Sequence, residues 1–307
     1  MTRTTSLVYS PAIEGFLGLK DEQTCPPKSA GAVIIPYGLE RSVSYGGGTA
    51  AGPRAMLRAS HQVELFDEEF WKEAYADYGV ATLEEPTIPE AIPDALDQLE
   101  QLVEEVLASG RFPMTFGGEH SISAGAIRPF ARRYDDLAIL HFDAHADLRD
   151  GYDGEHYSHA AALRRCLDFE HISLVSLGIR NISQEEIPFL EANRHRIDIH
   201  WAREKAQWDL TKILAALTGK HVYLTVDLDG FDASVMPATG TPEPGGLFWD
   251  DVLPVIRAAA NCSTIVGADI NELAPQRGMH GCDFLAAKLA YKIMSYVLAS
   301  PDKKSSC

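Results

Sequence analysis

Apolar residues occur along this chain as short uninterrupted runs separated by longer amphipathic segments. One run begins at residue 112, and others cover residues 31–36, 136–142, 172–178, 221–226 and 264–268. Runs of this length without polar alternation are typical of strands buried on both faces. The material between most runs is long enough for a crossover helix. The pattern therefore predicts an α/β fold with a mostly parallel sheet covered on both faces.

Three segments have the periodicity of amphipathic helices, at about residues 52–60, 93–108 and 281–299. Pro93 suits the first turn of the second helix, and Gly110 suits its end. Its apolar stripe is Leu96, Leu99, Val103, Val106 and Leu107. The last helix is expected to bury Phe284, Leu285, Leu289, Ile293 and Val297.

One domain boundary is expected near residue 30. Residues 1–30 are irregular and contain prolines, which predicts an N-terminal arm that wraps the domain or a neighbour. No Pro/Ser-rich linker interrupts residues 31–307, so these are expected to form a single domain. With 46% hydrophobic residues among 307, the chain can bury a large core.

The composition excludes several classes of function. A formal charge of −17 argues against nucleic-acid binding and favours a soluble protein with cationic ligands. The five cysteines are scattered without C-x-x-C spacing, which argues against a disulfide framework or a thiolate zinc site. No apolar stretch approaches ~18 residues, and the first residues lack a signal-peptide core. We therefore expect a cytoplasmic protein that does not bind membranes.

Three of the apolar runs end in clusters of acidic and imidazole side chains. These clusters contain Glu119 and His120, then Asp143, His145 and Asp147, and then Asp227, Asp229 and Asp232. In an open parallel sheet, ligands bind beyond the carboxyl ends of the strands, so the three clusters are expected to meet in one site. Carboxylates gathered in this way repel one another unless cations lie between them. The sequence therefore predicts a metal-dependent hydrolase.

The number of candidate ligands indicates two ions rather than one. Asp143, His145 and Asp147 occupy alternate positions, which on an extended backbone would point to one face. A single such Asp is more often a helix N-cap, but several caps at ligand spacing on three strands are not expected by chance. Four carboxylates with two imidazoles fit a pair of ions about 3.5–4 Å apart. Without thiolates the set suits Mn²⁺ best, while Mg²⁺, Zn²⁺ and Ni²⁺ stay open.

These motifs resemble those of the ureohydrolase family of arginases and agmatinases, which cleave urea from guanidinium compounds. The matching segments are residues 117–121, 143–147 and 227–246, and the resemblance runs from about residue 30 to the C-terminus. It implies an arginase-like three-layer α/β/α fold with an eight-stranded, mainly parallel sheet. Two positions depart from the family pattern, Glu119 in place of Asp and Ala233 in place of Pro, and neither is expected to bind metal.

The resemblance implies two Mn²⁺ ions per subunit and a role for each ligand. His120 and Asp147 would bind one ion, His145 and Asp229 would bind the other, and Asp143 and Asp227 would bridge the two. Asp232 would anchor the site from outside the ligand set. His141, which precedes the second cluster, is a candidate support for the metal ligands. The family also suggests a homo-oligomer, either a trimer or a hexamer.

The resemblance further implies the residues that handle the substrate. Glu272 corresponds to the family's guanidinium-binding glutamate, and Thr241 corresponds to a hydroxyl beside the substrate. His159 matches a mobile histidine that passes a proton to the leaving amine, a role that His156 is less suited to fill. Asp143, Glu272 and His159 are therefore the expected catalytic residues.

The loop after Asp147 is expected to select the substrate. Arginases hold the substrate's α-carboxylate with Asn and Ser in this loop, whereas here Arg149 replaces the first and extra acids such as Asp153 are present. This loss favours agmatine, which would give putrescine and urea for polyamine biosynthesis. Arg149 could instead pair with a carboxylate, which would suit guanidinobutyrate or another ω-guanidino acid. Arginine and guanidine remain alternative substrates. A non-catalytic subunit with this fold remains the alternative to an enzyme.

Overall fold

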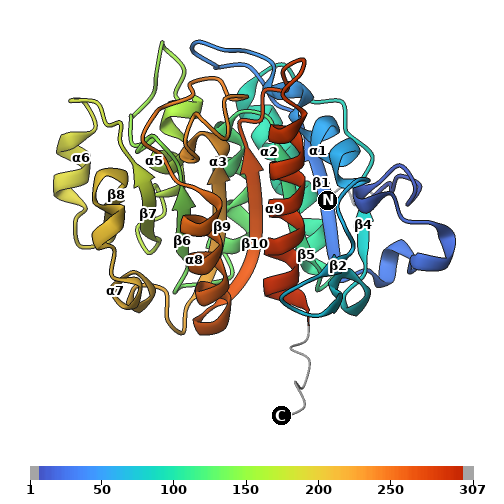
Figure 1. Ribbon diagram of the computed structural model, residues 1–307. Helices are drawn as coiled ribbons and strands as arrows, with labels where there is room; N and C mark the ends of the chain where they lie inside the picture. The colour runs from blue at the N-terminus through green and yellow to red at the C-terminus, as the bar shows by residue number, and fades with distance from the viewer. Residues whose placement is uncertain (1–6, 300–307) are drawn as a thin grey trace, which may run out of the picture.

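The computed structural model describes residues 7–299 and has an eight-stranded central sheet (Figure 1). The strand order is β4-β1-β5-β10-β9-β6-β7-β8, and every neighbouring pair is parallel. The strands are β1 (Ala32–Tyr37), β4 (Val80–Thr82), β5 (Phe112–Gly117), β6 (Ala138–Phe142), β7 (Ser173–Ile179), β8 (Ile197–Trp201), β9 (His221–Asp227) and β10 (Thr264–Asn271). The predicted α/β class and parallel sheet are confirmed.

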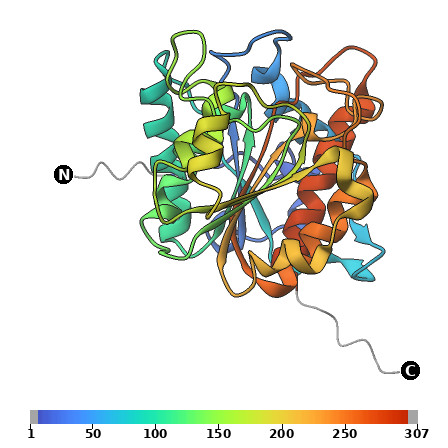
Figure 2. The same cartoon turned by 90° about the vertical axis from the view of Figure 1, so that its left-hand side faces the viewer.

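Helices cover both faces of the sheet. They are α1 (Gly52–Ser60), α2 (Ile92–Ala108), α3 (Ser123–Ala126), α4 (Arg128–Ala131), α5 (Ala162–Cys166), α6 (Ile187–Ala192), α7 (Leu210–Ala215), α8 (Trp249–Cys262) and α9 (His280–Leu298). In Figure 1, α1, α8 and α9 lie in front of the sheet, while α2 and α3 lie behind it. Figure 2, turned by 90°, shows the sheet between these two layers, which confirms the three-layer α/β/α arrangement.

The strands divide the apolar core in two because successive side chains point to opposite faces. Ile34 of β1 and Leu140 of β6 join the core under α1, α8 and α9. Val33, Ile35 and Ile139 join the core under α2 and α3. All five side chains are fully buried. The uninterrupted apolar runs in the sequence are thus explained by helices on both sides of the sheet.

The predicted helices are found with nearly the same ends, but one predicted face is wrong. Phe284 of α9 is 40% exposed, whereas Leu289 and Ile293 are buried as expected. The buried face of α9 is completed instead by small residues, including Ala286 and Ala287. Small side chains let α9 approach its neighbours closely. Such buried small residues are not revealed by the spacing of large apolar residues.

Two strands of the main sheet and one hairpin were not predicted. Strand β4 has three residues, and β8 at the opposite edge mixes apolar and polar residues with partial exposure. The separate antiparallel hairpin of β2 (Phe66–Asp67) and β3 (Lys72–Glu73) is shorter still. Edge strands have one neighbour, so they do not need the long apolar run that marks a central strand.

The predicted N-terminal arm, as far as residues 7–30 show it, lies against the domain. It contains 3-10 turns at Phe16–Gly18, Asp21–Gln23 and Pro27–Ser29. The ring centroids of Phe16 and Phe116 are 5.5 Å apart, so the segment shares the core of the domain. Residues 1–6 of the predicted arm lie outside the described residues. Within residues 7–299, no helix has both the length and the apolar character needed to cross a bilayer.

Candidate metal centre and active site

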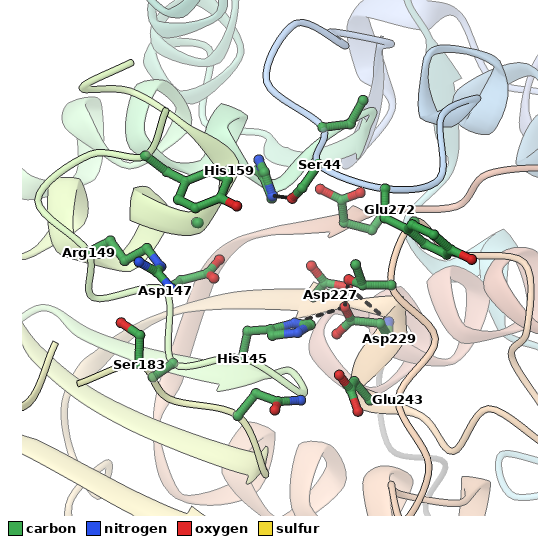
Figure 3. A pocket seen from close by; sticks show the side chains of 18 of the residues that line it. Ser44, His145, Asp147, Arg149, His159, Ser183, Asp227, Asp229, Glu243 and Glu272 are labelled. Atoms are coloured by element: carbon green, nitrogen blue, oxygen red, sulfur yellow. Dashed lines mark hydrogen bonds and ion pairs between the residues drawn. The ribbon is translucent and has the colours of Figure 1, made fainter. Parts of the chain in front are cut away.

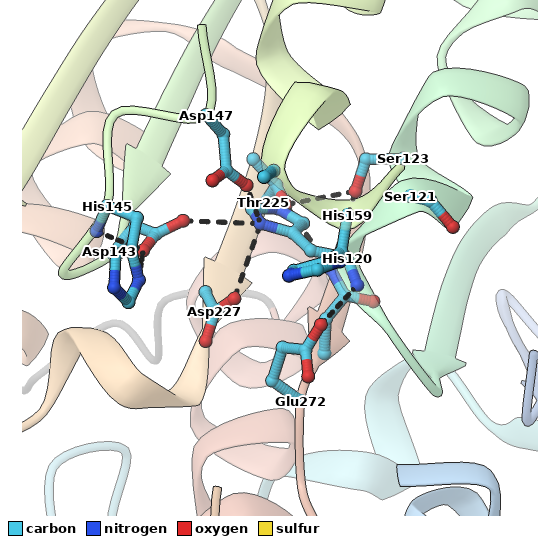
Figure 4. A network of polar contacts seen from close by, with 12 residues as sticks. His120, Ser121, Ser123, Asp143, His145, Asp147, His159, Thr225, Asp227 and Glu272 are labelled. Carbon is cyan, nitrogen blue, oxygen red and sulfur yellow. Dashed lines mark hydrogen bonds and ion pairs between the residues drawn. The ribbon is translucent and has the colours of Figure 1, made fainter. Parts of the chain in front are cut away.

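The four central strands bring the three acidic clusters to one edge of the sheet. His120 lies in a 3-10 turn after β5, and Glu272 directly follows β10. Asp227 is the last residue of β9, and Asp229 lies in the 3-10 turn behind it. The segment 143–147 follows β6. Because neighbouring parallel strands end at the same edge, all six predicted ligands meet there (Figures 3 and 4).

The first group of ligands surrounds Nδ1 of His120, as Figure 4 shows. This atom lies 3.0 Å from Asp147 Oδ2, 3.2 Å from Asp143 Oδ2 and 3.4 Å from Asp227 Oδ2. Nδ1 has no well-formed hydrogen bond, although it is buried. The other ring nitrogen, Nε2, lies 2.9 Å from the hydroxyl of Thr225, which fixes the ring. One imidazole and three carboxylate oxygens are therefore directed at a common point.

The second group of ligands is centred on His145. Its Nδ1 lies 3.0 Å from Asp229 Oδ2 and 3.6 Å from Asp143 Oδ1. Asp143, His145 and Asp229 each offer a ligand atom within 4.8 Å of the others, a spacing that can hold a metal ion. Asp143 directs one oxygen to each group of ligands, as the predicted bridging role requires.

The chain itself provides little positive charge for these acids. Within residues 7–299, no Lys or Arg forms an ion pair with the carboxylates of Asp143, Asp147, Asp227 or Asp229. Burial, followed by the charge of Asp143, raises the pKa of Asp147 to about 7. Burial, followed by Asp229 and Asp143, also raises the pKa of Asp227 well above its ordinary range. A donor set of carboxylates and imidazoles without thiolates fits divalent cations that would offset this repulsion.

Buried side chains around the ligands hold them in place. His141 places Nε2 2.8 Å from Asp143 Oδ2 and Nδ1 2.9 Å from the hydroxyl of Ser176, so it supports Asp143 as suggested from the sequence. Asp269 accepts hydrogen bonds from the hydroxyls of Thr225 and Tyr223, at 2.5 and 2.6 Å. Asp269 thereby orients Thr225, which in turn contacts His120. This supporting role of Asp269 was not predicted.

The predicted extended path of residues 143–147 is found as far as Ala146 and fails at Asp147. His145 forms a parallel bridge with Asn181, and the backbone of Ala146 donates to Asn181 at 3.1 Å. Strand β6 ends at Phe142, and Asp147 has a left-handed backbone with φ of 52°. Glu272 is also left-handed, with φ of 66°. This conformation is unfavourable for residues other than glycine and is frequent at functional sites. Asp143 and His145 therefore lie on an extended continuation of the strand, whereas Asp147 is turned toward the other ligands by its left-handed backbone.

A cavity of about 300 Å³ opens beside the ligands (Figure 3). His145, Asp147, Asp227 and Asp229 form part of its lining. The glycine-rich loop closes another side, where Gly46 donates a backbone hydrogen bond of 3.1 Å to Gly240. A Cβ atom at Gly46 would lie 2.9 Å from that carbonyl oxygen, so only glycine permits this approach.

Glu272, Thr241 and His159 are three of the four predicted substrate residues that line this cavity, and Arg149 is the fourth. Glu272 is buried and accepts a 2.7 Å hydrogen bond from the backbone of His120, and burial raises the pKa of its carboxyl. The hydroxyl of Thr241 donates to Asp229 at 3.3 Å. His159 places Nε2 2.8 Å from the hydroxyl of Ser44, and burial lowers the pKa of its imidazole. All three therefore border the same cavity as the candidate metal ligands.

His156 and Asp153, in the loop that follows Asp147, lie outside the main cavity. His156 does not line the cavity, because its ring lies against the guanidinium of Arg165. Asp153 lies in an adjoining hollow together with Tyr152 and Glu155. That hollow shares Tyr152 with the main cavity, so the two openings are neighbours.

Arg149 lines the cavity but already has a partner. Its guanidinium donates to Glu185 at 2.8 Å and lies 5.0 Å from the ring centroid of Tyr152. Neither contact was predicted, because Glu185 lies far along the chain and is itself largely exposed. Glu186 and Glu243, which also line the cavity, were not selected from the sequence.

Glu119, one of the two departures from the family pattern, holds a loop of the cavity. Its carboxylate accepts backbone hydrogen bonds from Arg41 and Ser42, at 2.6 and 2.7 Å. Ser42 in turn donates its hydroxyl to Glu119 at 2.8 Å and contacts His159. The acid at this position therefore positions the loop beside the proton-transfer candidate and does not join the ligand set.

Comparison with known proteins agrees with this architecture. The Arginase family pattern matches residues 30–296. The N(1)-aminopropylagmatine ureohydrolase of Synechocystis sp. is 36% identical over 93% of this chain and 95% of its own. The agmatinase of Bacillus anthracis is 34% identical over 79% and 83% of the two chains. The solved structure of agmatine ureohydrolase from Thermoplasma volcanium is 28% identical, with a TM-score of 0.82 over 94% and 95%.

The protein belongs to the arginase family. More particularly, it is a ureohydrolase, a hydrolase that acts on guanidino C–N bonds.

Proposed function

We propose that the protein is a binuclear manganese hydrolase that releases urea from a guanidino amine, with agmatine as the first candidate substrate. The observation that carries this proposal is the position of Glu272. Its buried carboxylate borders the cavity that the candidate metal ligands also line. A fixed carboxylate is the natural receptor for a planar guanidinium, because it accepts two parallel hydrogen bonds. Glu272 would therefore hold the guanidinium beside the ligands.

The ligand set supplies the site for the attacking water. His120 and Asp147 would hold one Mn²⁺, His145 and Asp229 the other, and Asp143 with Asp227 would lie between them. Bound manganese would supply a water of lowered pKa at neutral pH. The chain's own residues would orient the substrate. Glu272 would hold the guanidinium, and Thr241 lines the same cavity.

His159 would transfer a proton to the nitrogen that leaves as a primary amine. Its ring borders the cavity and is held by the hydroxyls of Ser44 and Ser42. Burial lowers its pKa, which favours the neutral imidazole that can first accept a proton and then donate it.

Two guanidino amines are candidate substrates. Agmatine is supported by the relatives named agmatinase and by the ion pair that already engages Arg149, which leaves it less suited to bind a substrate carboxylate. N(1)-aminopropylagmatine is favoured by the Synechocystis relative and by the hollow that adjoins the cavity at Tyr152. That hollow could take the aminopropyl extension of the longer compound.

The test is urea release by purified protein loaded with Mn²⁺. Agmatine, N(1)-aminopropylagmatine, arginine, guanidinobutyrate and guanidine are offered separately, and initial rates are compared over a range of concentrations. We expect the highest kcat/KM for one of the two guanidino amines. Higher kcat/KM for guanidinobutyrate or arginine would overturn the substrate class. Elemental analysis should find two Mn²⁺ per chain, and one or none would contradict the binuclear centre.

A further inference from the structure

The loop that follows Thr241 brings one further carboxylate, that of Glu243, into the cavity. The proposed reaction gives this carboxylate no role. Glu243 lines the cavity and is half-buried there. Figure 3 shows its side chain directed into the space beside His145 and Asp229. Within residues 7–299, its carboxylate has no hydrogen bond or ion pair, although the side chains around it are well connected.

The other charged groups of the cavity wall have partners or roles. Glu186 accepts backbone hydrogen bonds from Leu148 at 2.8 Å and Ser183 at 2.5 Å, one on each oxygen. Arg149 is paired with Glu185. The remaining acids of the lining are candidate metal ligands or the guanidinium receptor, Glu272. Glu243 is therefore the carboxylate that remains available to a ligand in the cavity.

The backbone of Glu243 is held firmly, so its side chain has a fixed origin. Its carbonyl accepts from Nη2 of Arg180 at 2.9 Å and from the backbone of Ala233 at 3.3 Å. Further along the loop, Asp232 accepts backbone hydrogen bonds from Gly245 and Gly246, at 2.6 and 2.9 Å. These contacts involve main-chain atoms of the loop. A change of the Glu243 side chain should therefore leave the loop in place.

We propose that Glu243 binds the protonated nitrogen at the other end of the butyl chain that carries the guanidinium, and thereby selects guanidino amines. This inference rests on the proposed function and deepens it. Agmatine and N(1)-aminopropylagmatine both carry a cationic nitrogen at the same distance from the guanidinium, as a primary and a secondary ammonium. A carboxylate in a partly buried cavity forms a charge-assisted hydrogen bond to either ammonium and repels the carboxylate of a guanidino acid.

The test compares Glu243→Gln with the wild-type protein on three substrates of similar length. These are agmatine, an n-alkylguanidine without the second charge, and guanidinobutyrate. The amide keeps the size of the side chain and removes its charge. We expect KM for agmatine to rise about 10- to 100-fold, because one charge-assisted contact is lost. The kcat/KM for the alkylguanidine and the Mn²⁺ content should stay at the wild-type values, and guanidinobutyrate should improve relative to agmatine.

Glu204→Gln is a matched control, because Glu204 is an exposed glutamate paired with Arg203 on the surface. An unchanged KM for agmatine in Glu243→Gln, or an equal loss for agmatine and the alkylguanidine, would overturn the inference. A shift in Asp153→Asn but not in Glu243→Gln would place the ammonium in the adjoining hollow and would overturn it as well. If the wild-type protein releases no urea from agmatine or its aminopropyl derivative, the proposed function itself fails.

Discussion

Two groups of acids in this protein, each with at least one fully buried carboxylate, have their negative charge compensated in different ways. In the first, which we call the lysine clasp, Asp67, Glu68 and Glu69 surround Lys292 of α9. Nζ of Lys292 lies 3.0 Å from an oxygen of each acid, and the lysine is 1% exposed. In the second, the candidate metal centre, Asp143 and its neighbours have imidazoles as their only basic side-chain partners within residues 7–299.

The difference separates a structural role from a catalytic one. The lysine clasp joins the segment at β2 to α9 and is complete within the chain, so it needs nothing from solution. The candidate metal centre has imidazoles as the only basic side-chain partners of its acids within the described residues, so divalent cations would offset its remaining negative charge. Acids that are paired with a lysine of the chain are thus expected to stabilise the fold, and acids without a Lys or Arg partner are candidates for binding ligands.

The largest expected effect comes from breaking the candidate metal centre at Asp143. Asp143→Asn removes a carboxylate that faces both groups of ligands, so Mn²⁺ content should fall from two per chain to at most one. Urea release should fall by more than about 100-fold, since even residues that only support metal ligands contribute this much. Elemental analysis and a urea assay measure both effects. The matched change in the lysine clasp, Asp67→Asn, should retain both ions. Two Mn²⁺ ions retained in Asp143→Asn would exclude the bridging role.

Breaking the lysine clasp should affect stability rather than chemistry. Lys292→Met leaves the buried Asp67 and the exposed Glu68 without a cation, while Glu69 keeps its ion pair with Arg257. We expect the free energy of unfolding to fall by about 3 kcal/mol, mainly because Asp67 is buried without its partner. Equilibrium unfolding in urea measures this change. Mn²⁺ content and KM should match those of the wild-type protein at temperatures where the variant is folded. Unchanged stability would show that the clasp is not a structural element.

His159 sharpens the comparison within the active site, because it lies beside the cavity but is not part of the ligand set. His159→Ala should lower kcat about 100-fold, which is typical for loss of a positioned proton-transfer group. Its Mn²⁺ content should remain at two per chain. Single-turnover urea release with added imidazole should recover part of the rate. Undiminished turnover without imidazole would remove the proposed role.

The smallest effect concerns how pH acts on the lysine clasp. Although burial opposes the shift, the hydrogen bonds to Glu69 hold its pKa below the ordinary 4.5, and the three acids hold that of Lys292 above 10.5. An acid whose pKa is lower in the folded than in the unfolded protein stabilises the fold above its pKa in the unfolded chain. This contribution is lost as the pH falls. A lysine whose pKa is higher in the folded than in the unfolded protein stabilises the fold below its pKa in the unfolded chain. This contribution is lost as the pH rises.

The stability difference between wild-type protein and Lys292→Met should therefore be largest between about pH 5 and 10. It should shrink on both sides of this range. Urea unfolding at about pH 3.5, 7.5 and 11 tests this expectation. A difference that does not change with pH would indicate that packing of the lysine stem, rather than its charge, stabilises the clasp.

The sequence predicted the residues whose role is carried by a local motif. The segments 143–147 and 227–229 each place several ligand-type residues beside a strand end, so their meeting follows from the parallel sheet. The roles of Glu243 and Asp269 could not be predicted in the same way. They depend on which side chains remain unpaired or lie behind a ligand after folding. Arg149 was open to two interpretations for the same reason, since its partner Glu185 lies in a different segment.

The order of strands has a consequence for how this site is made. Strand β10 is the last strand within residues 7–299 but lies in the middle of the sheet, between β5 and β9. Before β10 is added, the sheet consists of two separate halves, one carrying His120 and the other carrying the aspartates. During synthesis, nearly the whole chain must therefore emerge before the ligands can meet. Such long-range closure is slow, and cations can be captured as a complete set only after it.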